Sequence, residues 1–194
     1  MSSKPSPLPN RVTPFGEIVA VSARGSMMGN RGGKIHDGWR IVRKQASRRW
    51  IICVCEFKGR QRKVMESGYT ELFFLDEATA MAAGHRPCFE CRRASAKAYA
   101  AALGIPRADD IDLAVAKDRL KPAPISLSER LPDGAMIAVS DAAYLVLGGA
   151  YHRWSFDGYG APERLSGDAR LLTPRASVSA LAAGYRPVLH SSAC

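Results

Sequence analysis

Two closely spaced pairs of cysteines constrain this chain more than any other feature. Cys88 and Cys91 lie in the stretch HRPCFECRR, and Cys53 and Cys55 lie in WIICVCEF. Zinc binds four soft or borderline ligands in a tetrahedron, and a C-x-x-C pair reaches one ion easily when its first cysteine lies in a turn and its second begins a helix. Pro87 and the alanine-rich run after Cys91 provide that setting. We therefore expect a zinc ion bound by all four cysteines, which joins a strand to the start of a helix.

The C-x-C spacing of the earlier pair leaves an alternative open. In an extended strand, β-carbons two residues apart are separated by about 6.6 Å, whereas sulfurs that share a zinc ion lie about 3.8 Å apart. Suitable rotamers close this gap. Otherwise one cysteine of the pair stays outside the site, and a histidine such as His36 or His85 replaces it. For Cys88 and Cys91 the alternative is a pair of buried thiols that pack as small hydrophobic groups.

Length and composition place the chain among soluble globular proteins. Its 194 residues can bury a core without disulfides. No apolar run is long enough to cross a bilayer, and the start MSSKPSPLPNRVTPFGE lacks the apolar core of a secretory signal. We therefore expect a cytoplasmic protein without membrane contact. In that reducing compartment clustered cysteines indicate metal binding or reactivity rather than disulfides.

The charge of the chain favours a polyanionic partner. The formal net charge is +10, from 28 Lys and Arg against 18 Asp and Glu. Each phosphate that a basic side chain neutralises releases condensed counterions, so nucleic acid, above all DNA, is the expected partner. The candidate contacts are basic residues near the cysteines and in a glycine-rich stretch: Arg31, Lys34, Arg60, Arg62, Arg86, Arg92 and Arg93.

The first part of the chain predicts a tail, two strands and a loop between them. Four prolines in residues 1–14 predict a mobile tail. Apolar residues in 16–24 and 48–60 are spaced as in strands, and alternation places Cys53 and Cys55 on one face of the second strand. Residues 25–38, GSMMGNRGGKIHDG, predict a loop whose backbone can approach a ligand closely.

Helices are expected around and after the second cysteine pair. Asp76 can cap the start of a short helix, and Gly84 can close its end in the left-handed conformation. An alanine-rich segment from Cys88 to Gly104 predicts a second helix. Residues 108–120 predict a third.

The C-terminal part predicts strands and contains a repeat. Three prolines in 121–134 indicate a linker, and strands are expected at 135–140, 143–156 with a hairpin at Gly148-Gly149, and 169–173. The stretch ALAAGYRPVLHSS repeats AMAAGHRPCFECR at a shift of 100 residues, with Val188 and Ser191 in place of the two cysteines. The helix, its glycine cap and the Arg-Pro pair can therefore serve structure alone, and any special chemistry of the first copy resides in its cysteines.

These elements together predict an α+β fold, with a small mixed or antiparallel sheet and short helices around a Cys-ligated zinc. We expect a tail at 1–14, a zinc-binding domain at 15–120, a Pro-rich linker at 121–134 and a β-rich lobe at 135–194. This lobe would end in a second copy of the helix–strand unit that residues 76–91 form.

The stretch FLDEATAMAAGHRPCFEC resembles the zinc-binding segment of the N-terminal domain of Ada-type DNA repair proteins, and the resemblance covers about residues 50–93. In that family four cysteines bind zinc, and one from an earlier pair removes a methyl group from a DNA phosphotriester. The resemblance implies a zinc site at Cys88 and Cys91, with Cys53 and Cys55 as the earlier pair and one of those two as the methyl acceptor. The earlier pair is spaced more closely here than in that family.

Three functions follow as hypotheses. The first is a zinc-containing protein that binds nucleic acid, in repair or regulation. The second is an enzyme acting on nucleic acid, either by thiolate alkyl transfer at Cys53 or Cys55 or by phosphate chemistry at the glycine-rich stretch. The third is a structural zinc protein whose partner is another protein.

Overall fold

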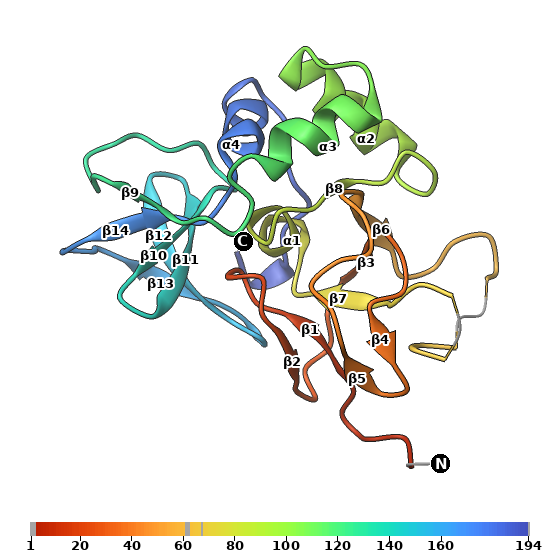
Figure 1. Cartoon of the computed structure of the whole chain (residues 1–194). Coiled ribbons are helices and arrows are strands. Elements are labelled where there is room, and N and C mark those ends of the chain that lie inside the picture. The colour runs from red at the N-terminus through yellow and green to blue at the C-terminus, as the bar shows by residue number, and fades with distance from the viewer. Residues whose placement is uncertain (1–2, 61–62, 67, 194) are drawn as a thin grey trace.

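The computed structural model describes residues 3–60, 63–66 and 68–193. In these residues the chain forms two six-stranded sheets and four α-helices. The first sheet comes from the N-terminal part and the second from the C-terminal part, with helix α1 (Glu77–Ala82) between them (Figure 1). The expected α+β class is confirmed, since a mixed sheet with short helices is followed by a second β-rich unit.

The first sheet is mixed and ends beside the cysteines. Its strand order is β2-β1-β7-β3-β6-β8, in which β1 pairs with β7 and β6 pairs with β8 in parallel, and the other neighbours are antiparallel. The bounds are β1 (Pro9–Val12), β2 (Ile18–Ala20), β3 (Met27–Arg31), β6 (Trp50–Val54), β7 (Leu72–Phe74) and β8 (Arg86–Pro87). A separate hairpin joins β4 (His36–Asp37) to β5 (Arg40–Ile41).

The prediction that the glycine-rich stretch 25–38 forms a loop is wrong in part, because residues 27–31 and 36–37 form strands and only residues 32–35 between them do not. Met27–Arg31 forms β3, a buried strand between β7 and β6. A β-carbon at Gly29 would lie 2.2 Å from the carbonyl oxygen of Ile51 on β6, so this position needs glycine for close packing of two strands. Gly29, one of the glycines that suggested a ligand-binding loop, therefore allows two strands of the sheet to pack closely.

The prediction of a mobile tail is wrong for its last part. Pro9–Val12 forms β1 between β2 and β7, and Val12 is 1% exposed. Proline is accepted here because it is the first residue of the strand, where a missing N–H costs least. Proline content alone does not show whether the following residues find a partner strand.

The second sheet is antiparallel throughout. Its order is β13-β12-β11-β10-β14-β9. The bounds are β9 (Ala123–Ile125), β10 (Met136–Val139), β11 (Ala142–Leu147), β12 (Ala150–Ser155), β13 (Gly158–Glu163) and β14 (Ala169–Leu171). The hairpin at Gly148-Gly149 is confirmed. The linker prediction is wrong in part, because β9 lies inside residues 121–134 and pairs with β14.

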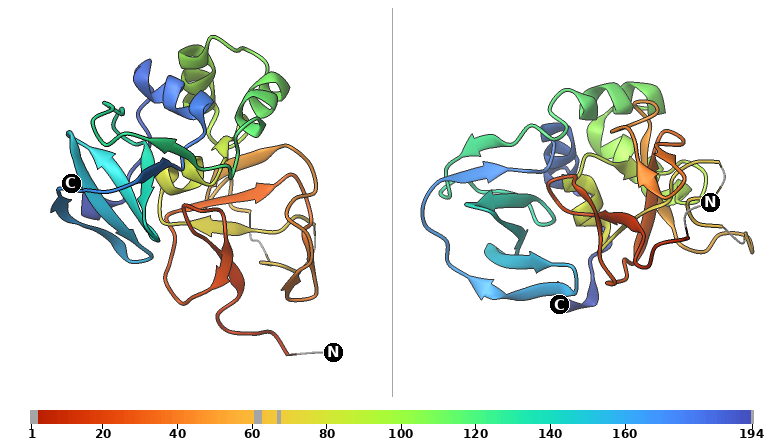
Figure 2. Two further views of the ribbon diagram at one scale, coloured as in Figure 1. Left: turned by 60° about the vertical axis from the view of Figure 1, so that its left-hand side comes forward. Right: turned by 60° about the horizontal axis from the view of Figure 1, so that its bottom comes forward.

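The helices gather over one end of the two sheets, with α1 between the sheets in all three views (Figures 1 and 2). The other bounds are α2 (Arg93–Leu103), α3 (Ala108–Ala116), α4 (Arg175–Ala182) and the 3₁₀ turn η1 (Ser191–Ala193). Asp76 caps α1 as predicted, since its carboxylate accepts from the N–H of Thr79 at 2.9 Å. The second helix begins at Arg93 rather than Cys88, so both cysteines lie in the turn before it.

The repeated stretch has the same helix end in both copies. The N–H of Gly84 donates to Met81 and that of His85 to Ala80, while Gly184 and Tyr185 donate to Leu181 and Ala180 in the second copy. Gly84 and Gly184 both have positive φ, at 83° and 101°. The strand is not repeated, because residues 185–190 form none. The second copy therefore shares the helix and its cap, but not β8.

A single hydrophobic cluster joins the two sheets. It contains Val12 and Phe74 from the first sheet together with Tyr144 and Leu171 from the second. The two β-rich parts thus share a core and hold one another in place. In the described residues no helix has the length and apolar character that a membrane span needs.

Candidate metal centre

Cys53 reaches the site because it points away from the main core. On β6, Ile52 belongs to the large hydrophobic cluster, whereas Cys53 belongs to a small one with Met28 on β3. This is the alternation that the sequence predicts for a strand. Cys53 is 6% exposed, and its thiol faces the small cluster, which Ile51 and Phe73 border.

The parallel pairing of β6 with β8 brings the second cysteine pair to Cys53. Ile52 is opposite Pro87, and the N–H of Cys88 donates to the carbonyl of Ile52 at 2.9 Å. The chain then turns, and the N–H of Arg92 returns to the carbonyl of Cys88 at 3.1 Å. This turn carries Cys91 back over the end of β6.

As a result, the sulfurs of Cys53, Cys88 and Cys91 all lie within 4.8 Å of one another. Cys53 and Cys88 are buried, and Cys91 is half-buried. Three thiols at this separation could hold a metal ion, since thiolates on one tetrahedral zinc lie about 3.8 Å apart. The predicted joining of a strand to the residues before a helix is therefore present in the geometry.

The two turn thiols are placed to carry negative charge. Hydrogen bonding with Cys53 lowers the pKa of Cys88 to about 5, with help from the backbone N–H groups of Cys91 and Glu90 and against the effect of burial. Hydrogen bonding with Cys53 likewise lowers the pKa of Cys91, and bonds to the same two thiols raise that of Cys53. Thiolates are the metal-binding form of cysteine, and a cation among the three sulfurs would replace the shared proton.

Cys55 lies outside this group. Strand β6 ends at Val54, and Cys55 follows in a bend with its side chain exposed. Its thiol donates to the carbonyl of Ser26 at 3.5 Å. The alternative in which one cysteine of the C-x-C pair is left out is thus the one that the geometry favours, and the expected set of four cysteines is corrected to three.

Neither candidate histidine replaces Cys55. His85 is fully buried and packs against the rings of Trp50 and Phe74, with centroids 4.9 and 4.7 Å away. Burial and the charges of Arg31 and Arg119 keep its pKa well below the usual range, so it is a neutral core residue. His36 bonds to Thr70 at 2.6 Å. Neither belongs to a group of metal-binding side chains within the described residues.

Three of the candidate nucleic-acid contacts are core residues. Arg86 forms two hydrogen bonds with Asp112, and Arg92 forms two with Glu77; both arginines are almost fully buried. Arg31 is 2% exposed and stacks on the ring of Trp50. They cannot meet a phosphate at the surface, and the expectation that they do so is corrected.

The other candidates lie at the surface or outside the described residues. Arg93 and Lys34 are exposed. Arg60 is exposed and pairs with Glu90, at 2.7 Å, in the cysteine turn. Arg62 falls outside the described residues.

A groove begins at the cysteine turn, and Arg93 is the one residue lining it, among those described, that the sequence had marked as a candidate contact. A cavity of about 530 Å³ lies along α2 and is bordered by Phe89, Arg93, Lys97 and Ile105. Phe89 lies between the two turn cysteines in the sequence. Arg93 and Lys97 are four residues apart, which puts them on one face of a helix. That spacing was visible in the sequence and would have grouped Lys97 with Arg93.

No family model, curated protein or solved structure matches this chain. The features of this chain that point to a function are therefore the three clustered sulfurs and the surface beside them.

Proposed function

We propose that the protein binds zinc through Cys53, Cys88 and Cys91. The turn that contains Cys88 and Cys91, together with helix α2, then binds single-stranded nucleic acid. The observation that carries the proposal is the position of Phe89, between two of the three clustered cysteines and at the start of a groove lined by basic residues. A metal at the sulfurs would fix this turn against β6.

Zinc fits the donor set better than harder cations. Three sulfur ligands select soft or borderline metals, whereas magnesium and calcium prefer oxygen. The N–H of Glu90 donates to the sulfur of Cys88 at 3.4 Å, which supports a thiolate with an outer hydrogen bond of the kind that orients metal ligands. Three protein ligands leave a fourth position for water or another donor.

The groove along α2 suits a base and its phosphates. Phe89 and Ile105 are half-buried and Ala100 is buried, so the inner lining is apolar, while the exposed Arg93 and Lys97 form the rim. Bases of any sequence stack on aromatic rings, and basic side chains hold the backbone beside them. A single strand exposes both features at once, unlike a duplex.

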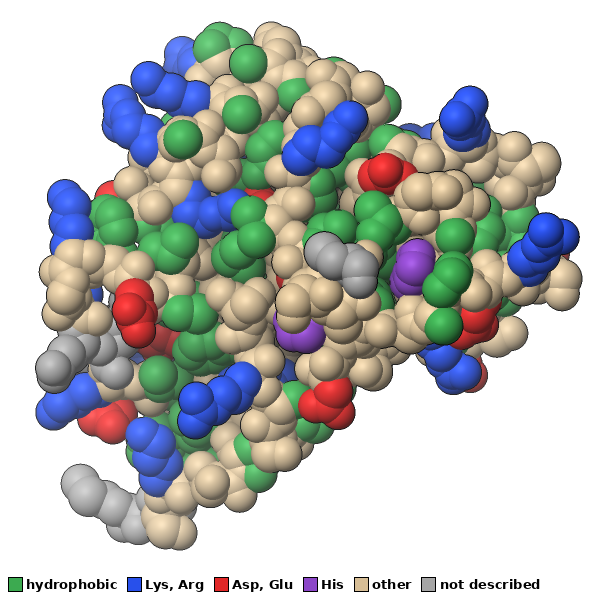
Figure 3. Space-filling model, turned by 180° about the vertical axis from the view of Figure 1, so that it is seen from behind, with side chains coloured by type: hydrophobic (Ala, Val, Ile, Leu, Met, Phe, Trp, Pro, Cys, Tyr) green, Lys and Arg blue, Asp and Glu red, His purple; other side chains and the backbone are tan. Residues whose placement is uncertain are grey.

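The surface charge supports the same partner. Four basic and four acidic side chains are buried in the described residues: Arg31, Arg86, Arg92, Arg119, Glu71, Asp76, Glu77 and Asp112. The buried charges cancel, so the net +10 of the chain is carried by the rest of it. Lys and Arg side chains are spread widely over the face in Figure 3 rather than gathered in one patch. Such a surface attracts a polyanion, and the groove provides the local contact.

Removing both rim cations should weaken binding and reduce its salt dependence. For the double variant Arg93→Ala/Lys97→Ala, the slope of log affinity against log salt should fall by about 1.4, since each phosphate contact on a single strand contributes about 0.7. Fluorescence anisotropy of a labelled oligonucleotide at several salt concentrations measures this slope.

Arg130→Ala/Arg164→Ala is the matched control. It removes the same charge from exposed positions between strands of the second sheet, and the contribution of Arg93 and Lys97 to the salt slope should remain. Equal slopes for the two double variants would show that only net charge matters. Binding that does not change with salt would exclude the nucleic-acid proposal, and a partner retained after nuclease treatment would point to a protein instead.

Alkyl transfer is a second candidate, and it concerns Cys55. This thiol is exposed, whereas Cys53 is buried, so the acceptor is narrowed to Cys55. Burial lowers the pKa of Arg11 and the charge of Cys55 counteracts this, so the guanidinium, which donates to Ala23 and Asn10, lies near this thiol. The thiolate sulfur would form a bond to the methyl carbon as the methyl–oxygen bond breaks, leaving a phosphodiester anion.

After exposure to an oligonucleotide with a methyl phosphotriester, the intact protein should gain the mass of one CH₂ group, because a methyl group replaces the thiol proton. The gain should be absent in Cys55→Ser. An unchanged mass of the native protein excludes this candidate while leaving metal and nucleic-acid binding unaffected.

A further inference from the structure

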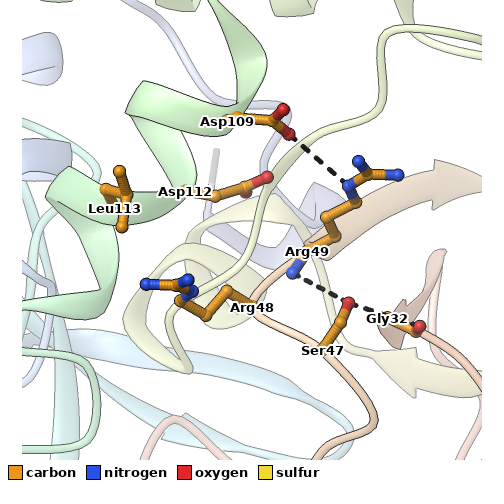
Figure 4. Close-up of a pocket in the computed structure, with 7 residues that line it drawn as sticks. All are labelled: Gly32, Ser47, Arg48, Arg49, Asp109, Asp112 and Leu113. Carbon is orange, nitrogen blue, oxygen red and sulfur yellow. Dashed lines mark hydrogen bonds and ion pairs between the residues drawn. The ribbon is translucent and has the colours of Figure 1, made fainter.

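A second cavity lies at the opposite end of β6 from Cys53. It has a volume of about 540 Å³ and lies between residues 47–49, which precede β6, and the first half of α3. Figure 4 shows Arg48 and Arg49 on one side, with Asp109, Asp112 and Leu113 of α3 facing them. Nothing in the zinc and nucleic-acid proposal uses this cavity, so an inference about it stands on its own.

The charged side chains that line this cavity differ in how strongly they are already paired with other side chains. Both oxygens of Asp112 accept hydrogen bonds from Arg86 at 3.0 Å. Asp109 pairs with Arg49 at 3.5 Å, but both side chains are more than 60% exposed, and pairs of this kind are weak. Within the described residues the guanidinium of Arg48 has no hydrogen bond or ion pair. Arg48 is thus available to a ligand, and Arg49 can exchange its partner.

Behind this wall buried positive charge exceeds negative charge, because the carboxylate of Asp112 pairs with Arg86 and also acts on Arg119, whereas Arg31 has no such neighbour among the residues described. The guanidinium groups of Arg31 and Arg119 lie 4.1 and 4.3 Å from the centre of the Trp50 ring. In the part of the chain that the structure describes, both arginines donate only to backbone carbonyls, and one of those bonds joins Arg119 to the carbonyl of Arg48 at 3.2 Å. The Nε of Arg31 is buried without a partner in the described residues. Burial, and then the neighbouring arginine, lowers the pKa of Arg31 to about 9, which reflects this crowding of cations.

The geometry points to a binding site for a small phosphate ester, held by Arg48 and Arg49 and with its organic part against Leu113. A guanidinium group can donate two parallel hydrogen bonds to the oxygens of a phosphate. The excess positive charge of the buried arginines behind Arg48 attracts a phosphate dianion more strongly than a singly charged anion. Leu113 is 46% exposed at the rim, and such an apolar side chain gives nothing to an inorganic ion but can contact a nucleoside or sugar. The volume of the cavity suits a ligand of mononucleotide size.

Calorimetry with adenosine 5′-monophosphate at low salt tests this site. We expect saturable binding to the native protein, a loss of about tenfold or more in Arg48→Ala, and partial recovery in Arg48→Lys. Arg130→Ala removes the same charge from an exposed position between β9 and β10 and should bind the monophosphate as the native protein does. Because Arg48 is exposed, its replacement should leave the fold intact, which circular dichroism can verify.

Further titrations test whether the nucleoside part of the ligand contacts Leu113. Leu113→Ser should weaken binding of the monophosphate and leave the weaker binding of inorganic phosphate unchanged, and uncharged adenosine should not bind. The inference is overturned if no heat is observed with millimolar monophosphate, if inorganic phosphate binds as tightly, or if Arg130→Ala loses as much affinity as Arg48→Ala. Each of these results is independent of metal content and of oligonucleotide binding at α2.

Discussion

Cys53→Ser is expected to lose stoichiometric zinc, whereas Cys55→Ser should keep it. The two cysteines are neighbours on the same chain segment, yet only Cys53 lies within 4.8 Å of the sulfurs of Cys88 and Cys91. Removing a direct ligand should lower zinc affinity by more than the roughly 10–100-fold that loss of an outer partner of a ligand costs. Cys88→Ser and Cys91→Ser should behave like Cys53→Ser.

Metal analysis of the purified variants measures this effect, and thermal unfolding with and without a chelator measures its consequence. Binding of a metal to the folded state alone stabilises that state, so a chelator should lower the melting temperature of the native protein and of Cys55→Ser. It should have little effect on the other three variants. Equal loss of zinc in Cys55→Ser would mean that Cys55 moves in as a fourth ligand, and a native protein without zinc would remove the metal proposal altogether.

The parts of the site that the sequence predicted depend on local rules. The C-x-x-C spacing placed Cys88 and Cys91 together, and period-two alternation placed Cys53 on the opposite face of its strand from Ile52. The cap at Asp76 and the left-handed Gly84 follow from side-chain chemistry within one turn. Such features need no knowledge of distant partners.

The sequence-based predictions were wrong where the structure of a segment depends on contacts with residues far away in the sequence. Glycines in residues 25–38 indicated a loop, but Gly29 lets β3 approach β6. Arg86 and Arg92 were expected at the surface because they are charged, but each has a buried carboxylate partner from a distant part of the chain. The identity of Cys55 as the cysteine left out depends on where β6 ends, which is set by its pairing with β3. None of these partners can be identified from spacing in one sequence.

One of those buried pairs connects the cysteine turn to the C-terminal lobe. Arg92 follows Cys91 directly, and its two terminal nitrogens donate to the two oxygens of Glu77 at 2.6 and 2.7 Å. The hydroxyl of Tyr185 and the N–H of Val188 donate to the same oxygens at 2.6 and 2.8 Å. Glu77 is 0% exposed, so this buried carboxylate joins groups from the turn to groups from the second copy of the repeat.

Glu77→Gln should therefore destabilise the whole protein. An amide keeps the size of the side chain, but it leaves Arg92 as an uncompensated buried charge and turns an NH₂ group toward other donors. Breaking a buried pair in this way costs about 3–5 kcal/mol, which corresponds to a fall in melting temperature of roughly 6–20 °C for a chain of this length. Urea unfolding and thermal scans of the variant measure both quantities.

Glu90→Gln is the matched control, because Glu90 pairs with Arg60 in the same turn but is 61% exposed. Its loss should cost at most about 1 kcal/mol, as for other exposed pairs. If Glu77→Gln were as mild as Glu90→Gln, the four hydrogen bonds to this carboxylate would not hold the lobes together. A large effect that persists after zinc removal would show that the link between turn and lobe is formed by Glu77 itself and not by the metal.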